Sequence, residues 1–358
     1  ALYRRKDMIL GPGVNIYRTP LGGRNFEYMG EDPYLASRMV VPYIQGMQSK
    51  GVAACVKHFA LNNDEEYRHQ VNVIVDDRAL HEIYLPAFKA AVTEAGVWGI
   101  MGAYNMYKNQ HNCHNQWLLN DILKGQWHFD GVVVSDWGGA HDTRQAVENG
   151  LDMEFGTWTD GLAFGTSDAY DNYYLASPYR KLIQDGTYTE KELNDKVRRV
   201  LRLFFRTNMN RNRQFGSLCS EAHYDAARKI AAEGIVLLQN KGRVLPIDTL
   251  KARRVLVVGE NAIKMMTVGG GSSSLKAQHE ELPLDGLKAC LEGMNIEVDY
   301  ARGYVGDITG EYNGVTTGQQ LADSRSPEEL IAEAVDKARK ADYVVFFGGL
   351  NKSDYQDA

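Results

Sequence analysis

The sequence predicts two consecutive α/β domains, of which the first is a barrel of parallel strands and helices. Short apolar runs alternate with helical patterns from residue 8 to about residue 156, and the alternation starts again after a polar stretch at residues 207–221. Such alternation is typical of a parallel sheet with crossover helices. The chain has 358 residues, too many for one ordinary core and enough for two.

Five apolar runs of the first block are predicted to be strands, with helices between them. The predicted strands are residues 8–17, 51–59, 98–105, 131–137 and 151–155. The predicted helices are residues 32–50, 78–95, 115–127, 142–149, 178–184 and 189–205, which carry apolar residues at helical spacing. Because a closed (β/α)₈ barrel has eight strands, we expect the remaining ones to precede Ala1.

The second block repeats the pattern of a parallel α/β layer. Its predicted elements are helix 222–232, strand 253–261, helix 284–294, strand 296–301, helix 326–340 and strand 342–350. Ser326 followed by Pro327 and two glutamates predicts a capped helix start. The predicted domains are therefore 1–206 for a partial barrel, 207–221 for a linker and 222–358 for a partial second domain.

Composition excludes several classes of protein. The net charge is −6 and no stretch is rich in lysine or arginine, which argues against nucleic acid as a partner. No apolar run approaches the ~20 residues of a membrane span. Four scattered cysteines without a CxxC pair argue against a disulfide framework or a zinc site. The compartment stays open, with a periplasmic or secreted location favoured, and a homodimer is possible.

Polar residues gather where the predicted strands end, which is where parallel barrels build their sites. These residues are Arg24, Lys57, His58, Tyr104, Asn105, Asp136, Trp137 and Glu154, and Arg68 follows the second strand. Each has a structural alternative: Arg24 and Arg68 could simply pair with Glu27 and Glu65, and the two aromatic residues could belong to the core. A shared site explains the whole set better than separate structural roles do.

Cleavage of a glycosidic bond is the chemistry that suits this set. A retaining glycosidase needs one carboxylate as nucleophile and a second as acid and base. Lysine, arginine and histidine can hold sugar hydroxyls, and tryptophan offers a flat wall to a sugar face. We expect Asp136 to have a depressed pKa beside lysine and arginine side chains, as an ionised nucleophile requires.

Several long segments resemble family 3 glycoside hydrolases, in the family's order. They are GPGVNIYRTPLGGRNFEYMGEDPYLASRM, VKHFALNNDEEYR, DDRALHEIYLPAFKAAV, IMGAYNMYKN, WLLNDILKGQWHFDGVVVSDWGGAHDT, AARKIAAEGIVLLQNKGRVLPI and GGGSSSL. The resemblance covers nearly the whole chain. It implies a (β/α)₈ barrel followed by an α/β sandwich. It also implies an enzyme that uses no metal or organic cofactor.

The resemblance also implies roles for individual residues. Asp136 matches the family's nucleophile, and Trp137 forms part of the wall. The residues that match the lining of the nonreducing-end sugar site are Arg24, Lys57, His58, Arg68, Met101 and Tyr104. A further sugar-binding aspartate is expected before Ala1. The acid/base glutamate is expected in a loop of the second domain just after Ala358; Glu154, Asp354 and Asp357 are weaker internal candidates.

The expected function is a retaining exo-acting β-glucosidase that acts on β-linked oligosaccharides or glycosides. The stretch KHFALNNDEEYR lacks the His-Gly-Asp loop of the family's N-acetylglucosaminidases, and Trp137 favours a glucosidase over a xylosidase. A β-xylosidase, another family 3 exo-glycosidase and a non-enzymatic glycan-binding protein stay open. VLVVGENA lacks the second glycine of a dinucleotide-binding fingerprint, which disfavours an oxidoreductase.

Overall fold

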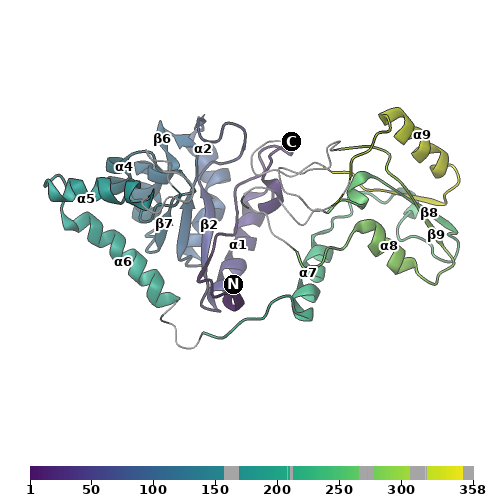
Figure 1. Cartoon of the computed structure of the whole chain (residues 1–358), viewed down its shortest axis with the longest axis horizontal. Coiled ribbons are helices and arrows are strands. Elements are labelled where there is room, and N and C mark those ends of the chain that lie inside the picture. The colour runs from purple at the N-terminus through teal and green to yellow at the C-terminus, as the bar shows by residue number, and fades with distance from the viewer. Residues whose placement is uncertain are drawn as a thin grey trace. The chain divides into compact units, whose positions relative to one another are not determined.

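The chain forms two compact units in the computed structural model (Figure 1). The structure describes residues 1–156, 169–207, 209, 213–265, 272, 277–306, 319 and 321–349. The first unit comprises Ala1–Leu218 and the second begins at Cys219. The division lies within the polar stretch that is predicted to be a linker.

The first unit contains a four-stranded parallel sheet in chain order. The strands are β1 (Met8–Ile9), β2 (Ala53–Phe59), β4 (Gly99–Gly102) and β7 (Val132–Val134). Val134 also forms a parallel bridge with Met153, where the fifth strand is predicted. Beyond β1 the chain continues beside β2, because the Val14 amide donates to the Lys57 carbonyl at 2.9 Å. Sequential parallel order with intervening helices is that of a barrel wall.

Helices cover one face of this sheet. The α-helices are α1 (Pro33–Gln48), α2 (Asp77–Ala79), α3 (Pro86–Thr93), α4 (Thr143–Glu148), α5 (Ser177–Gln184) and α6 (Glu190–Arg206). Short 3₁₀ turns are η1 (Leu2–Arg4), η2 (Asn25–Glu27), η4 (Asn112–His114) and η6 (Ala169–Asn172). Asp32 caps α1 by accepting from the amides of Tyr34 and Leu35.

Two of the predicted helices are not continuous α-helices. The segment predicted at 78–95 contains a π-helical stretch, η3 (Leu80–Tyr84), before α3 begins at Pro86. Pro86 has no N–H to donate, and the Leu85 amide reaches back five residues to the Leu80 carbonyl at 3.0 Å. The segment predicted at 115–127 is also π-helical, as η5 (Trp117–Gln126).

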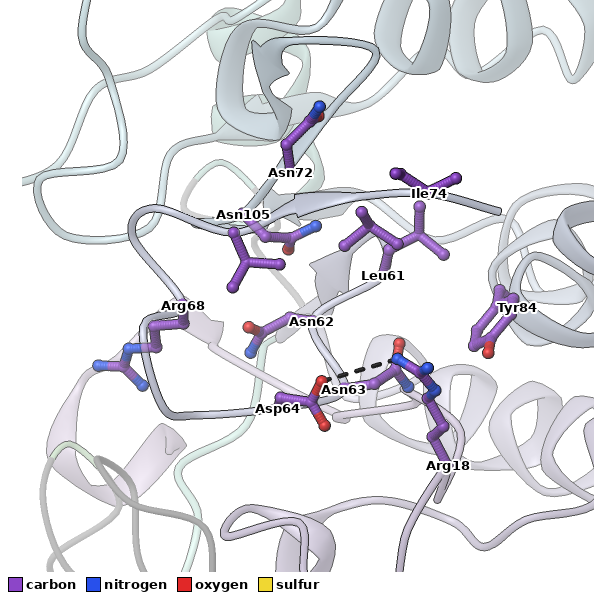
Figure 2. A pocket seen from close by; sticks show the side chains of 12 residues that line it. Arg18, Leu61, Asn62, Asn63, Asp64, Arg68, Asn72, Ile74, Tyr84 and Asn105 are labelled. Carbon is purple, nitrogen blue, oxygen red and sulfur yellow. Dashed lines mark ion pairs between the residues drawn. The ribbon is translucent and has the colours of Figure 1, made fainter. Parts of the chain in front are cut away.

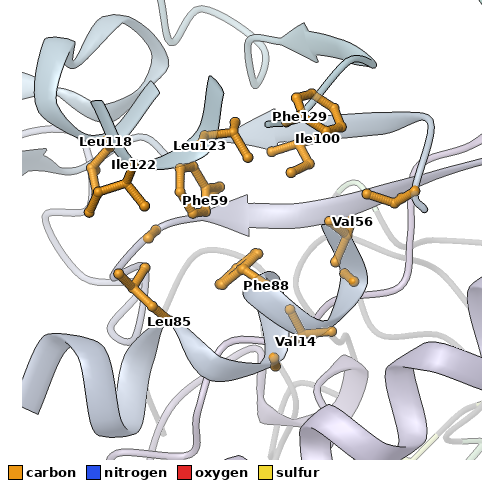
Figure 3. Close-up of a cluster of buried hydrophobic side chains, with 14 of the residues drawn as sticks. Val14, Val56, Phe59, Leu85, Phe88, Ile100, Leu118, Ile122, Leu123 and Phe129 are labelled. Carbon is orange, nitrogen blue, oxygen red and sulfur yellow. The ribbon is translucent and has the colours of Figure 1, made fainter. Parts of the chain in front are cut away.

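The two faces of the sheet are both apolar, as barrel strands require. On the helix side, Phe59, Ile100 and Val133 belong to a large buried cluster that includes Phe88 and Leu123 (Figure 3). On the other side, a smaller cluster is built from the alternate strand residues Cys55, Met101, Val132 and Val134. A small additional sheet of β3 (Asn72–Val73), β5 (Met106–Tyr107) and β6 (Gln110–His111) is not predicted by the sequence pattern.

The second unit is a three-stranded parallel sheet with a helix on each face. The strands β8 (Arg254–Val258), β9 (Glu297–Ala301) and β10 (Tyr343–Phe346) lie in the order β10-β8-β9. Leu256 and Val258 face α9 (Pro327–Ala338), whereas Val257 faces α8 (Pro283–Leu291). The remaining elements are α7 (Glu221–Gly234), η7 (Lys241–Arg243) and η8 (Glu260–Ala262).

The predicted cap of α9 is confirmed. The Ser326 hydroxyl accepts from the Glu329 amide at 3.2 Å, and the Glu329 carboxylate accepts from the Ser326 amide at 2.8 Å. Across the described residues of both units, none of the helices combines the length and the hydropathy needed to cross a membrane.

Candidate active site

The ends of β2, β4 and β7 bring the predicted site residues into one neighbourhood. Lys57 and His58 lie near the C-terminal end of β2. Tyr104 lies two residues after the end of β4, and Asp136 lies two residues after the end of β7. Parallel pairing places Met101 of β4 beside Val134 of β7. The three strand ends therefore meet on the same edge of the sheet.

Asp136 is a buried carboxylate with one engaged and one unpartnered oxygen. Its residue surface is 7% exposed, and Oδ1 accepts from the Trp137 amide at 2.8 Å. Oδ2 is buried, accepts no hydrogen bond from the described part of the chain, and lies 3.7 Å from His58 Nε2. A buried carboxylate oxygen without a hydrogen bond destabilises the fold. Such an oxygen is typical of a functional site, where a ligand can supply the missing partner.

The expectation of a depressed pKa for Asp136 is wrong. Burial raises the pKa of this carboxyl, and it outweighs the lowering by Arg24, by the Trp137 amide, by the Tyr104 hydroxyl and by Arg68. The sequence indicates nearby cations but not how far the carboxyl is withdrawn from water. Asp136 is consequently a less stable anion than an exposed aspartate.

Hydrogen bonds hold His58 at its backbone amide, at its backbone carbonyl and at one ring nitrogen. Asn15 donates to its carbonyl at 3.0 Å and accepts from its amide at 2.8 Å. Its Nδ1 lies 3.2 Å from the Tyr28 hydroxyl. Burial, followed by the charges of Arg24, Lys57 and Arg68, lowers the pKa of His58 well below its usual value, so the imidazole is neutral.

Glu27 joins two of the predicted sugar-binding cations. Its Oε1 accepts from Arg24 Nε at 2.5 Å, and its Oε2 pairs with Lys57 Nζ at 3.0 Å. Arg24 is 3% exposed, and its burial beside a carboxylate fixes its position. The alternative pairing of Arg24 with Glu27 is therefore real, and the same carboxylate also orients Lys57 toward the site.

Arg68 is similarly paired and also covers an aromatic ring. It forms an ion pair with Glu65, and its guanidinium lies 4.7 Å from the centre of the Tyr104 ring. The ring of His69 also packs against Tyr104, with ring centres 4.2 Å apart. Burial and the charge of Asp136 raise the pKa of Tyr104, which keeps its hydroxyl protonated.

Three further predicted residues take different positions. Trp137 is 48% exposed and packs on Phe155 with ring centres 5.1 Å apart, so its face is available as a wall. Met101 is 2% exposed and contributes to the inner cluster of the sheet. Glu154 accepts from the amides of Tyr174 and Leu175 at 3.1 and 2.7 Å, so it anchors a turn.

A cavity of about 270 Å³ adjoins this neighbourhood in the first unit (Figure 2). Arg18 and Asp64 form an ion pair of 3.7 Å on one side of it, and Arg68 and Tyr84 lie toward opposite ends. Asn62 and Asn105 also line it. The cavity shares Arg68 with the candidate active site.

Residues of the site that the sequence does not single out are Asn15, Tyr28 and Asn62. Tyr28 lies in the same family-like segment as Arg24 and Glu27, but the resemblance gives it no role. The three have no distinguishing spacing, and their roles depend on tertiary contacts. Asp354 and Asp357 lie outside the described residues. Those residues contain no group of three or more histidine, cysteine or acidic side chains placed to hold a metal ion.

Models of two protein domains match this chain. The glycosyl hydrolase family 3 N-terminal domain matches residues 6–203, and the family 3 C-terminal domain matches residues 235–358. The chain belongs to glycoside hydrolase family 3. The predicted fold, a barrel followed by an α/β sandwich, is thereby confirmed, with the chain covering part of it.

Curated relatives and solved structures agree with this family. The chain is 53% identical over 362 aligned residues to β-glucosidase BoGH3A of Bacteroides ovatus, covering 100% of this chain and 47% of that protein. It is 36% identical to an exo-α-(1→6)-L-arabinopyranosidase of Bifidobacterium longum, covering 96% of this chain and 42% of that protein. The chain spans about half the length of the curated relatives it matches.

The similarity extends to three dimensions. The crystal structure of a family 3 β-glucosidase of Bifidobacterium adolescentis matches with a TM-score of 0.78 and 34% identity, covering 99% of this chain and 48% of that chain. A β-glucosidase 3B of Thermotoga neapolitana, solved in complex with glucose, matches with a TM-score of 0.79 and 28% identity, covering 98% and 48%.

Proposed function

We propose that the whole protein is a retaining exo-acting β-glycosidase that releases nonreducing-end glucose from β-glucosides or oligosaccharides. The observation that carries the proposal is the buried Asp136 carboxylate, with Oδ2 unpartnered among the described residues and close to His58. Arg24, Lys57, Arg68 and Tyr104 surround the same strand ends. The names of several relatives support glucose as the sugar.

The chemistry proceeds by two displacements at the anomeric carbon. Asp136 Oδ2 attacks this carbon while the bond to the leaving oxygen breaks, and the leaving oxygen takes a proton from a separate acid. Water then attacks the glycosyl ester and releases the sugar with Asp136 regenerated. The resemblance assigns the acid to the second domain, after β10 and outside the described residues.

The surrounding side chains bind the sugar and orient it. Lys57 and Arg24, both held by Glu27, can donate charge-assisted hydrogen bonds to sugar hydroxyls. Trp137, with half of its surface exposed beside Asp136, offers an apolar face for stacking. Interactions that strengthen as the ring flattens toward the transition state raise the rate.

A substrate panel with a nucleophile variant tests the proposal. We expect the full-length protein to hydrolyse 4-nitrophenyl β-glucoside, and Asp136→Asn to fold but lose nearly all turnover, because the amide is a poor nucleophile. An Asp136→Asn variant with wild-type activity would refute the assignment. Asp130→Asn is the matched control, because Asp130 pairs with Arg206 at the surface.

An arabinopyranosidase is the second candidate. One observation favours it, the 36% identity to an enzyme of that name. Comparing kcat/KM for 4-nitrophenyl β-glucoside, β-xyloside and α-L-arabinopyranoside decides between the sugars. The glucosidase proposal requires the highest value for the β-glucoside.

A further inference from the structure

The Tyr28 hydroxyl lies on the opposite side of the His58 ring from the nucleophile. It is 3.2 Å from His58 Nδ1, whereas His58 Nε2 is 3.7 Å from Asp136 Oδ2. The ring of Tyr28 meets the ring of His58 edge-on, with an angle of 74° between their planes. His58 is therefore placed between a phenol and a carboxylate, one at each nitrogen.

A neutral imidazole carries one N–H, and its neighbours decide which nitrogen has it. His58 is neutral, because it is buried beside three cations that lower its pKa. If the proton were on Nδ1, the lone pair of Nε2 would face the Asp136 carboxylate, which is repulsive. With the proton on Nε2, the N–H faces the carboxylate and Nδ1 must accept a hydrogen bond.

Tyr28 is suited to donate that hydrogen bond. Burial raises the pKa of its hydroxyl, so the proton stays on the oxygen. A protonated phenol oxygen that lies 3.2 Å from a ring nitrogen without a proton can donate its hydrogen to that nitrogen.

The backbone of the first strand segment creates the space for the Tyr28 ring. A Cβ added at Gly13 would lie 2.8 Å from Tyr28 Cδ1 and 3.0 Å from Cε1. Gly13 pairs with Lys57, the residue before His58, so the tyrosine is seated against the strand that carries the histidine. The Tyr17 hydroxyl fixes the other end by donating to the Tyr28 carbonyl at 3.1 Å.

We propose that Tyr28 is a positioning residue that holds His58 in its Nε2–H tautomer, with this N–H directed to the sugar beside Asp136. The sugar is the ligand of the proposed function, on which this part of the inference rests. In the complex, a hydroxyl oxygen of the sugar accepts from Nε2, and Tyr28 prevents the ring from turning or changing tautomer. Tyr28 itself does not touch the substrate.

Nitrogen NMR of the full-length protein labelled with ¹⁵N-histidine tests the tautomer without any substrate. The His58 signals are assigned by their loss in His58→Gln. We expect Nδ1 to have the shift of an unprotonated nitrogen that accepts a hydrogen bond, and Nε2 that of a protonated one. Tyr28→Phe should move the Nδ1 signal toward that of an unbonded nitrogen or populate the Nδ1–H tautomer.

Tyr179→Phe is the matched control, because Tyr179 is also buried and its hydroxyl has no hydrogen-bond partner among the described residues. It should leave the His58 signals and kcat/KM unchanged, whereas Tyr28→Phe should lower kcat/KM about 3- to 10-fold. An Nδ1–H tautomer in the wild type, or His58 signals unaffected by Tyr28→Phe, would overturn the inference. If the spectra change as expected but the wild type cleaves no glycoside, the tautomer assignment stands and the proposed function fails.

Discussion

At the scale of single residues, ion pairs fix the positions of two cationic side chains in the candidate site. Glu27 contacts both Arg24 and Lys57, so the two cations are held in place before any sugar binds. Preorganisation of this kind reduces the entropy that a side chain loses when it contacts a ligand. Tyr28 and His58 form a comparable pair, since the Tyr28 hydroxyl lies 3.2 Å from His58 Nδ1.

Lys57 provides the first test at this scale. A charge-assisted hydrogen bond contributes roughly 1.5–3 kcal/mol, so Lys57→Ala should lower kcat/KM for a β-glucoside more than ~10-fold. Lys251→Ala is the control, because Lys251 is 85% exposed and lies in the second unit. A loss of less than about threefold for Lys57→Ala would mean that the lysine only pairs with Glu27.

The pKa of Asp136 provides the second test. Because burial raises this pKa, the carboxylate is lost to protonation at a higher pH than an ordinary aspartate, whose pKa is about 3.9. The apparent pKa of the acid limb of the kcat/KM profile, which reports the free enzyme, should therefore be higher than about 3.9. Activity should rise as pH increases through this apparent pKa. Steady-state kinetics with an activated aryl glycoside, which needs little protonation, isolates this limb; a limb below pH ~3.9 would contradict the burial argument.

At the scale of elements, a group of histidines links the loop after the nucleophile to the small sheet. The ring of His111 in β6 stacks on His141 with centres 3.8 Å apart. His114 Nε2 accepts from the His141 amide at 3.1 Å, and its Nδ1 lies 3.1 Å from Gln145 Oε1 of α4. Nε2 can accept only while His114 is neutral, so the loop between β7 and α4 depends on an unprotonated ring.

This dependence predicts a loss of stability in acid. Burial and His111 lower the pKa of His114 to about 4, whereas an unfolded histidine has a pKa near 6.5. Between these values the unfolded chain binds the proton and the native one does not. The free energy of unfolding should therefore decrease by up to about 3 kcal/mol as pH falls from about 6.5 to about 4.

Urea unfolding followed by circular dichroism across this pH range measures the effect. His114→Gln keeps an oxygen that can accept from the His141 amide and removes the titration, so its stability should fall less in acid. His279→Gln is the control, because His279 is exposed and lies in the second unit. Equal pH slopes for the wild type and His114→Gln would show that another group governs acid stability.

The elements also show which features the sequence could predict. Apolar runs indicate β2, β4 and β7 and thereby place Lys57, His58 and Asp136 at strand ends. The π-helical stretches escape prediction because their apolar spacing is close to that of an α-helix. The contact of Tyr28 with His58 escapes it because a hydrogen bond between distant segments leaves no periodic pattern. The raised pKa of Asp136 depends on burial, which charge counting along the sequence does not reveal.

At the scale of the whole molecule, the predicted site residues are confined to one of the two units. The predicted nucleophile and the predicted sugar-contacting residues all lie in the first unit, Ala1–Leu218. The sequence predicts the division because a polar stretch interrupts two blocks of alternating strands and helices. Family membership extends over both units, with one domain model on each. Among the predicted site residues of the first unit, Asp136 is the one that the proposed mechanism requires to bond covalently to the sugar.

Covalent trapping tests that claim most directly. A 2-deoxy-2-fluoro β-glucoside with a good leaving group slows hydrolysis of the glycosyl ester more than its formation, so the intermediate accumulates on the nucleophile. After incubation of the full-length protein and proteolysis, mass spectrometry should find the fluoroglucosyl group on Asp136, in the peptide containing VVVSDW. A label on another carboxylate, or rapid turnover of ordinary glucosides without any label, would contradict the account.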